Sequence, residues 1–211
     1  MSVVLNHSVV RYFTLPLVET EVEEWASQQL LELQQLQQLQ QLDLCASAPT
    51  FGLLFCSEAA LPHAKEILEI VRIYAHVPVM IGCSGGGLVV DDREIEAEHG
   101  FAVALYYLPE TRATVRHVPA DCLLADDGGT ALKEFLGDSA AAANAWMLFA
   151  SSESLGAESW LADWDRATGG KVTLGGFACG SLMSLESTLF CDGQVHHDGA
   201  VALSLEGEVT I

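Results

Sequence analysis

The residues best suited to chemistry in this sequence are Cys83 and Ser84, which stand side by side in the glycine-rich segment Ile81–Gly87. A cysteine or serine becomes a nucleophile when a base lies within hydrogen-bond reach. The chain has seven histidines, but no motif or spacing places one of them beside Cys83. The order Gly-Cys-Ser-Gly also differs from the Gly-x-Ser-x-Gly nucleophile elbow. We therefore expect a protein that is not an enzyme, and a cysteine-dependent hydrolase is the lesser alternative.

Two glycine-rich segments, Ile81–Gly87 and Leu174–Gly180, are the candidate binding elements. Glycine lets a backbone approach a ligand closely, and a glycine-rich loop can offer its N–H groups to an anion. The same glycines also suit tight turns or close packing of strands. The first segment lacks the Lys-Ser/Thr ending of a P-loop and the dinucleotide fingerprint, which disfavours a nucleotide. The residues that we expect to face a small ligand are Gly82, Cys83, Ser84, Gly85, Gly86, Gly175, Gly176, Phe177 and Cys179.

Two polar clusters are candidates for a metal or haem site. In His196-His197-Asp198, adjacent side chains on a strand point to opposite faces, so only one histidine could act as an axial ligand. A solvated turn is the other interpretation of this cluster. Asp91-Asp92-Arg93-Glu94 could hold a hard cation, and a charged surface turn explains it equally well. We predict no metal site, and the cofactor is unknown.

The elements that must position these residues occur twice in the chain. Three segments of the first half have counterparts in the second half. They are Leu54–Ser57 with Leu148–Ser151, Val79–Gly87 with Val172–Gly180, and Ala102–Leu105 with Ala200–Leu203. The three pairs are offset by 94, 93 and 98 residues. Such regular spacing indicates a duplicated unit of strand, helix, strand, glycine loop and strand, in which both copies are needed to close the core. A cleft between the two glycine loops is then the natural binding site.

This pattern predicts an α/β (α+β) fold, with a mixed sheet or two packed sheets and helices on the outside. Residues 1–44 would form an N-terminal strand and a Gln/Leu-rich helix. Residues 45–211 would form one domain of two repeats, about 51–118 and 145–211, joined by a linker. Leucine recurs every third residue from Leu30 to Leu42, so the apolar stripe winds around the helix. A surface helix and a partner-binding helix both fit this stripe.

Composition excludes several classes of function. Nine basic against 29 acidic residues give a formal charge of −20, so nucleic acid is not an expected partner. No apolar run reaches the roughly 18 residues that a membrane-spanning helix needs. The six cysteines form no Cys-x-x-Cys pair, and the N-terminus does not resemble a signal peptide. We therefore expect a cytoplasmic protein with free thiols.

Four segments of the chain resemble the FIST family, a sensory domain of bacterial signalling proteins that also occurs in some eukaryotic F-box proteins. They are Phe51–Ser57, Ile81–Gly87, Leu174–Gly176 and Leu189–Val195 with Asp198–Leu203. The match is similar to the family's N-terminal domain and covers roughly residues 45–211. The C-terminal half of a full family member does not appear in this sequence, and the Gln/Leu helix is longer than the family requires.

The resemblance implies binding of a small ligand and coupling to a signalling partner. Some family members are described as haem-binding nitric oxide sensors, and bound amino acids have been proposed for others. We expect a small molecule and a protein as partners. The alternative is a protein-interaction subunit that binds no ligand, which the acidic composition and the Gln/Leu helix would suit.

Overall fold

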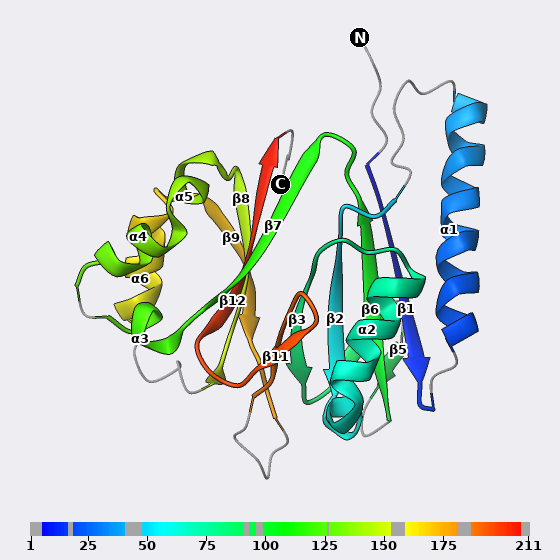
Figure 1. Cartoon of the computed structure of the whole chain (residues 1–211), viewed down its shortest axis with the longest axis horizontal. Coiled ribbons are helices and arrows are strands. Elements are labelled where there is room, and N and C mark those ends of the chain that lie inside the picture. The colour runs from blue at the N-terminus through cyan, green and yellow to red at the C-terminus, as the bar shows by residue number, and fades with distance from the viewer. Residues whose placement is uncertain are drawn as a thin grey trace.

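The chain folds into four layers, helices–sheet–sheet–helices (Figure 1). The computed structural model describes residues 6–16, 19–40, 48–90, 93–95, 99–125, 127–152, 159–180 and 187–207. One outer layer holds α1 (Glu19–Gln40), the 3-10 turn η1 (Glu58–His63) and α2 (Ala64–Tyr74). The other holds α3 (Ala120–Leu123), α4 (Thr130–Leu136), α5 (Asp138–Ala142) and α6 (Ser159–Ala167). This arrangement confirms the predicted class, in its version with two packed sheets and outer helices.

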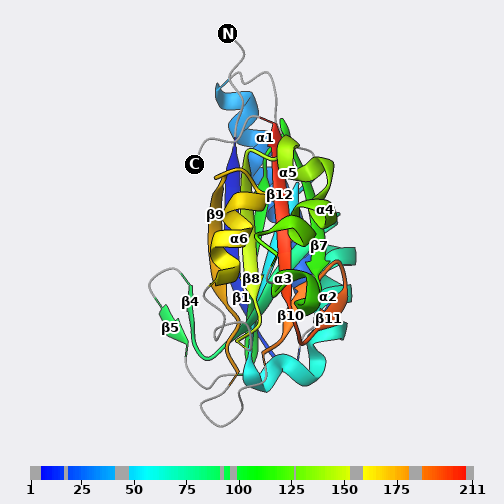
Figure 2. The same cartoon turned by 90° about the vertical axis from the view of Figure 1, so that its left-hand side faces the viewer.

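The first sheet has six strands in the order β1-β6-β2-β3-β10-β11. Their bounds are His7–Thr14, Gly100–Tyr107, Phe51–Ser57, Met80–Gly85, Leu189–Cys191 and Gln194–His196. The second sheet has the order β7-β12-β8-β9. Its bounds are Thr111–Val118, Ala200–Gly207, Ala145–Ala150 and Val172–Phe177. A separate hairpin, β4 (Leu88–Val90) with β5 (Arg93–Ile95), projects to one side in Figure 2 and packs against the first sheet through Leu88 and Ile95.

The two sheets share one pairing pattern. In each, a central strand pairs in parallel with the strand that follows its helix: β2 with β3, and β8 with β9. On its other side each central strand pairs antiparallel, β2 with β6 and β8 with β12. β1 lies beside β6 as β7 lies beside β12, again antiparallel. The sheets differ at one edge, because β10 and β11 extend the first sheet beyond β3.

The apolar run of β2 forms a strand that is buried on both faces, as expected for the middle of a covered sheet. Leu54 and Cys56 contact the cluster under the helices α1 and α2, which includes Ile67 of α2. Phe51 and Leu53 point the other way, into the core between the sheets. Side chains that alternate along the strand therefore fill two separate cores.

The core between the sheets joins the two halves of the chain. Ile81 and Leu189 of the first sheet lie in one cluster with Val201 and Leu203 of the second. Nearby, the rings of Phe55 and Phe149 meet edge to face with centroids 5.4 Å apart. Strands distant in the sequence thus bury each other's inner faces, and burial of this apolar area is the main force that holds the layers together.

The Gln/Leu-rich helix α1 covers the outer face of the first sheet. Val22, Trp25 and Leu33 are buried, and Trp25 packs edge-on against Phe13 of β1 at 5.4 Å. Leu39 is 80 % exposed, because a three-residue spacing drifts off the buried face. None of the described helices combines the length and apolar character that a membrane crossing requires.

Some sequence predictions fall outside the described residues. They are the end of the Gln/Leu-rich helix at residues 41–44 and the acidic pair at residues 91–92.

Candidate functional site

Four of the five predicted ligand-facing glycines lie within strands rather than in loops after them, and Gly86 lies in the bend that follows β3. Gly82 and Gly85 belong to β3, and Gly175 and Gly176 belong to β9. Gly82 pairs with Leu54, and a Cβ on Gly82 would overlap the Leu54 carbonyl oxygen. In the other sheet a Cβ on Gly175 would overlap the carbonyl of its partner Leu148 in the same way. At these two positions glycine is required by the close approach of the parallel neighbour.

Ser84 is a structural residue at the end of the first sheet. Its hydroxyl oxygen accepts the Thr188 N–H at 3.0 Å, and its own N–H donates to the Thr188 carbonyl at 2.8 Å. Its carbonyl accepts the Cys179 N–H at 3.2 Å. The side chain is buried, so these bonds satisfy polar groups that water cannot reach.

Cys83 lies in the core between the sheets and is only 6 % exposed. Burial, with a smaller contribution from nearby Cys179, raises the pKa of the Cys83 thiol to about 12. Burial also raises the pKa of Cys56. The thiolate is the nucleophilic form of cysteine, so these environments favour the unreactive thiol.

The two glycine-rich segments meet beyond the ends of β3 and β9. Cys179 hydrogen-bonds to Ser84, and a Cβ on the exposed Gly86 would lie 3.6 Å from the Gly180 carbonyl oxygen. Gly82, Cys83 and Ser84 are buried there, whereas Cys179 is exposed. Of the nine predicted residues, Gly175, Gly176 and Phe177 lie elsewhere, on a cavity along β9.

This cavity, of about 480 Å³, opens between α6 and the edge strand β9. Leu148 and Ala150 of β8 line it, with the aromatic side chains of Trp160, Trp164 and Phe177. The rings of Trp160 and Phe177 meet edge to face at 6.0 Å. A volume of roughly 300–1,000 Å³ with apolar walls and a few polar groups is typical of small-molecule sites.

Three polar side chains complete the lining, Asp165, Lys171 and Thr173. The Trp164 indole donates its N–H to the Thr173 hydroxyl at 3.0 Å, which fixes the indole against β9. Asp165 and Lys171 bring opposite charges to the same cavity. A ligand that carries both an anionic and a cationic group would find a counter-charge for each.

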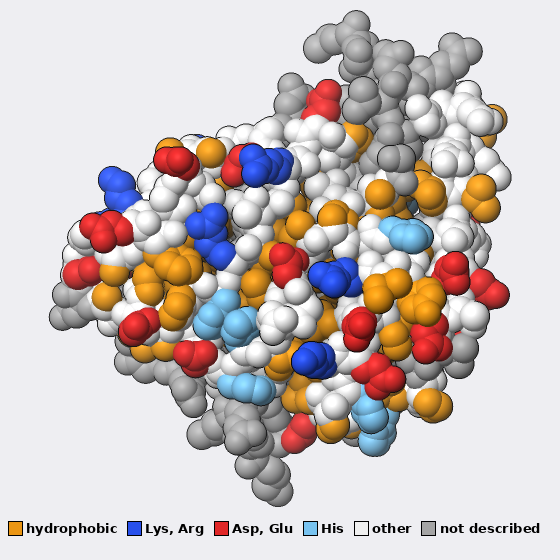
Figure 3. Space-filling model, in the orientation of Figure 1, with side chains coloured by type: hydrophobic (Ala, Val, Ile, Leu, Met, Phe, Trp, Pro, Cys, Tyr) orange, Lys and Arg blue, Asp and Glu red, His pale blue; other side chains and the backbone are white. Residues whose placement is uncertain are grey.

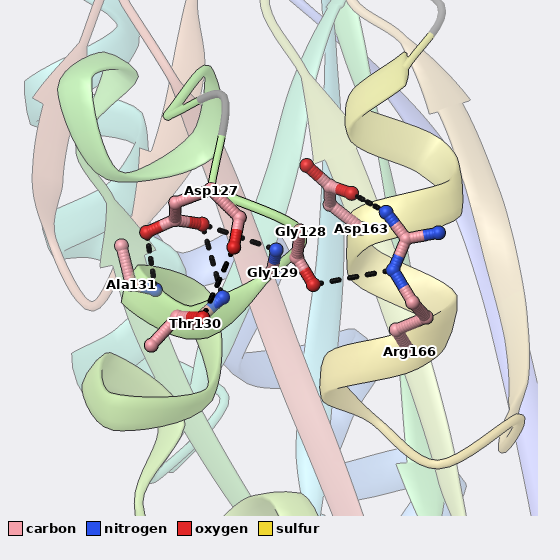
Figure 4. A network of polar contacts seen from close by, with 7 residues as sticks. All are labelled: Asp127, Gly128, Gly129, Thr130, Ala131, Asp163 and Arg166. Atoms are coloured by element: carbon pink, nitrogen blue, oxygen red, sulfur yellow. Dashed lines mark hydrogen bonds and ion pairs between the residues drawn. The ribbon is translucent and has the colours of Figure 1, made fainter.

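The helix α6, which forms one wall of the cavity, is held by a polar network with the start of α4 (Figure 4). The Asp127 carboxylate accepts N–H groups of Gly129, Thr130 and Ala131 at 3.1, 3.0 and 2.9 Å. This fixes the turn that presents the Gly128 carbonyl, which accepts the Arg166 Nε–H at 3.2 Å. Arg166 also pairs with the buried Asp163 of its own helix. The network therefore sets where α6 lies.

The His196 cluster occupies a different part of the molecule. His196 ends β11, and its ring stacks on His117 of β7 with centroids 3.8 Å apart and an interplanar angle of 8°. His117 Nε2 lies 3.0 Å from the Asp198 carbonyl oxygen. Burial, followed by the neighbouring His117, lowers the pKa of His196. Among the described residues no group of three or more His, Cys, Asp or Glu side chains could hold a metal ion.

A second cavity, of about 380 Å³, lies beside α2. Its lining includes Ile67 and Ile70, with His63, Glu66 and His99 at its polar side. His63 and Glu66 lie 3.6 Å apart and are largely exposed. This cavity lacks the aromatic walls of the first.

The sequence model of the FIST N domain matches residues 50–211. The chain belongs to the FIST family. The match begins where β2 begins, so β1 and α1, which complete the first sheet and its cover, precede the matched residues. No curated protein matches the chain. Membership confirms the resemblance and places this domain in a family of signalling-associated sensory domains.

None of the residues predicted to face a ligand lies on the α6 side of the cavity. Trp160 and Trp164 are four residues apart, a spacing that puts them on one face of a helix and is typical of core or interface packing. Both are in fact largely buried and also line the cavity. The signal that could have found them is their place in the helix that leads into the second glycine-rich segment.

Proposed function

We propose that this protein is a cytoplasmic, non-enzymatic sensory domain that binds a small ligand in the α6–β9 cavity and couples its occupancy to a protein partner. Family membership supports the sensory role. The cavity itself is the observation that carries the proposal, because it combines aromatic walls with the opposed charges of Asp165 and Lys171. Three of the residues expected to face a ligand, Gly175, Gly176 and Phe177, line it.

The lining favours a free amino acid or a similar small zwitterion. Asp165 would attract the ammonium group and Lys171 the carboxylate, while Trp160 and Trp164 would receive an apolar side chain. Haem is less well supported, because the described residues that line the cavity include no His, Cys, Met or Tyr side chain that could bind its iron. A cysteine hydrolase is also disfavoured, since Cys83 is buried and its pKa is raised to about 12.

A titration of the purified protein with the free amino acids, read by tryptophan fluorescence, tests this proposal. Two of the four tryptophans line the cavity, so a bound ligand should change the emission. Asp165→Asn and Lys171→Met should each weaken binding about tenfold, because each removes one charge-assisted contact. Glu69→Gln on the exposed face of α2 is the control and should leave the affinity unchanged.

Native mass spectrometry of the same preparations provides an independent readout. A bound mass that disappears in the Asp165 and Lys171 variants would support the site. Amides of the same amino acids, blocked at both ends, should not compete because they lack both charges. Equal binding by wild type and both variants would rule out this cavity as the site.

The alternative is a protein-interaction subunit that binds no ligand. It is favoured by Val172 and Leu174, apolar side chains of β9 that are about half exposed to solvent. An unchanged emission with every amino acid, together with a clean apo mass, would favour this alternative.

A further inference from the structure

The strands β3 and β9 hold the same position in their sheets but have different surroundings. Each pairs in parallel with the strand that precedes its helix. Every residue of β3 from Met80 to Ser84 is buried, whereas no residue of β9 is. The contrast is clearest just before the matching glycines, where Ile81 is 0 % exposed and Leu174 is 47 % exposed.

The difference arises from β10, which covers the second edge of β3. β10 runs antiparallel there and places Phe190 opposite Gly82. Phe190 is fully buried in the cluster under α2, and its neighbour Leu189 is buried in the core between the sheets. Along the described parts of the chain, β9 pairs with β8 and with no strand on its other side. That side is an open edge of the kind that accepts a further strand.

Both faces next to this edge have room for the side chains of an added strand. Side chains of a strand alternate between the two faces of the sheet. On the α6 side they would enter the 480 Å³ cavity beside Trp160 and Trp164. On the other side they would cover Leu174, which lies on the same face as Met147 by its register. The outer edge of the second sheet is visible at β9 in Figure 2.

We propose that the free edge of β9 receives an antiparallel strand from a partner protein, with an aromatic residue opposite Gly175. The pairing of Phe190 with Gly82 provides the template, because Gly175 makes the same contact with Leu148 that Gly82 makes with Leu54. The residues on either side of the aromatic one would be apolar, as Leu189 and Cys191 are, and would face Leu174. This proposal does not depend on a small ligand in the cavity.

Charge distinguishes a partner from a second copy of the chain. The protein carries a formal charge of −20, and acidic side chains are spread over the face shown in Figure 3 rather than gathered in one patch. A second copy would bring the same charge to the interface, and like charges oppose association. The occupant is therefore a strand with an apolar–aromatic–apolar centre and basic flanks.

Binding of a synthetic peptide tests the proposal. The probe has about ten residues, with Leu-Phe-Val at its centre and two lysines at each end. Fluorescence anisotropy should show binding to the full chain, and replacement of the peptide phenylalanine by alanine should weaken it about tenfold. Hydrogen exchange at the backbone amides of β9 should slow in the complex, because strand addition pairs them.

Leu174→Lys should weaken peptide binding about tenfold or more, because it places a like charge where an apolar neighbour is needed. Leu124→Lys is the matched control: this side chain is also exposed and apolar, lies after α3, and changes the net charge equally. Leu174 does not line the cavity, so amino-acid binding should survive its replacement and the two proposals can fail separately.

Three results would overturn the proposal. They are no binding up to about millimolar peptide, unchanged exchange at β9 in the saturated complex, and an equal effect of the Leu124 and Leu174 variants. Sedimentation of the chain alone provides one more check. A dimer that protects β9 without any peptide would make a second copy the occupant instead.

Discussion

At Gly82 and Gly175, the absence of a side chain lets two parallel strands come closer than any other residue would allow. The two glycines sit at matching places, opposite Leu54 and Leu148. Gly176, the next residue along β9, differs from both, because a Cβ there would find no atom within 4 Å. Glycine is thus required at one position of the Gly-Gly pair and optional at the other.

Replacement by alanine should distinguish the glycines that the close approach of strands requires, Gly82 and Gly175, from the optional Gly176. Gly175→Ala should lower the free energy of unfolding by about 1 to 3 kcal/mol, because the methyl group meets the backbone of β8 and no rotamer relieves the overlap. Gly82→Ala should have a similar effect, and Gly176→Ala should change stability by less than about 0.5 kcal/mol. Urea unfolding measures all three. Equal losses for Gly175→Ala and Gly176→Ala would show that the close approach is not the reason for the glycine.

Among the elements, α6 depends on its neighbour α4 for its position. Asp127 orders the turn before α4, and the carbonyl of Gly128 in that turn accepts a hydrogen bond from Arg166 of α6. The carboxylate also lies near the N-terminus of α4, where a negative charge is favourable. The position of α6, which forms one wall of the cavity, therefore depends on a hydrogen bond that lies outside the cavity.

A double-mutant cycle tests this link between α4 and α6. Asp127→Ala should cost about 1 to 2 kcal/mol of stability, since three backbone N–H groups lose their acceptor. Arg166→Met should cost less when Asp127 is already absent, with a coupling of more than about 0.5 kcal/mol. The control pair is Arg166→Met with Glu69→Ala on α2, whose effects should add. Additivity in the test pair would mean that the turn and the helix are independent.

For the molecule as a whole, the two sheets are joined by their shared core and by the stack of His117 on His196. His117 belongs to the second sheet and His196 to the first. The charged or titratable groups next to His196 are His117, Asp198 and His197. Burial and His117 lower the pKa of His196 below 6.5, so its neutral form is favoured in the folded protein.

Stability should therefore fall as the pH is lowered through about 6.5. Below that pH the unfolded chain binds a proton at His196 that the folded chain resists, so unfolding becomes more favourable. The loss should be less than about 1 kcal/mol, because the ring is only half-buried and solvent screens it. Urea unfolding at about pH 7.5 and 5.5 measures it.

His196→Phe is the informative variant for this prediction, since phenylalanine keeps an aromatic ring in the stack and removes the titration. It should show a smaller loss of stability between the two pH values than the wild type. His63→Gln, at an exposed histidine before α2, should behave like the wild type. A pH dependence that His196→Phe leaves unchanged would have to come from other groups.

The sequence was a good guide to the local elements. The segments expected as the last strand of each repeated unit, Ala102–Leu105 and Ala200–Leu203, lie within β6 and β12. The turn residues Asp192 and Gly193 join β10 to β11 as a hairpin. Hydrophobic runs and turn residues are local signals, so a single sequence can reveal them.

The positions that depend on distant pairing were not predictable in the same way. Gly82 and Gly85 were expected in a loop because glycine weakens an isolated strand, yet the parallel neighbour β2 makes them part of β3. The cavity could not be predicted from the sequence, because it forms only where α6 packs beside the edge of β9. Likewise, no local pattern says that Leu189–Cys191 pairs with β3 or that His196 meets His117.

The pairing of β10 with β3 also has a consequence for synthesis of the chain. Ser84 and Thr188, which hydrogen-bond where these strands meet, are 104 positions apart. While the protein is being translated, β3 can form beside β2 long before its other neighbour has left the ribosome. Domains exposed in this way are prone to incorrect pairing, and contacts so distant in sequence form slowly. The first sheet of the nascent protein is thus completed late, by residues from the second half.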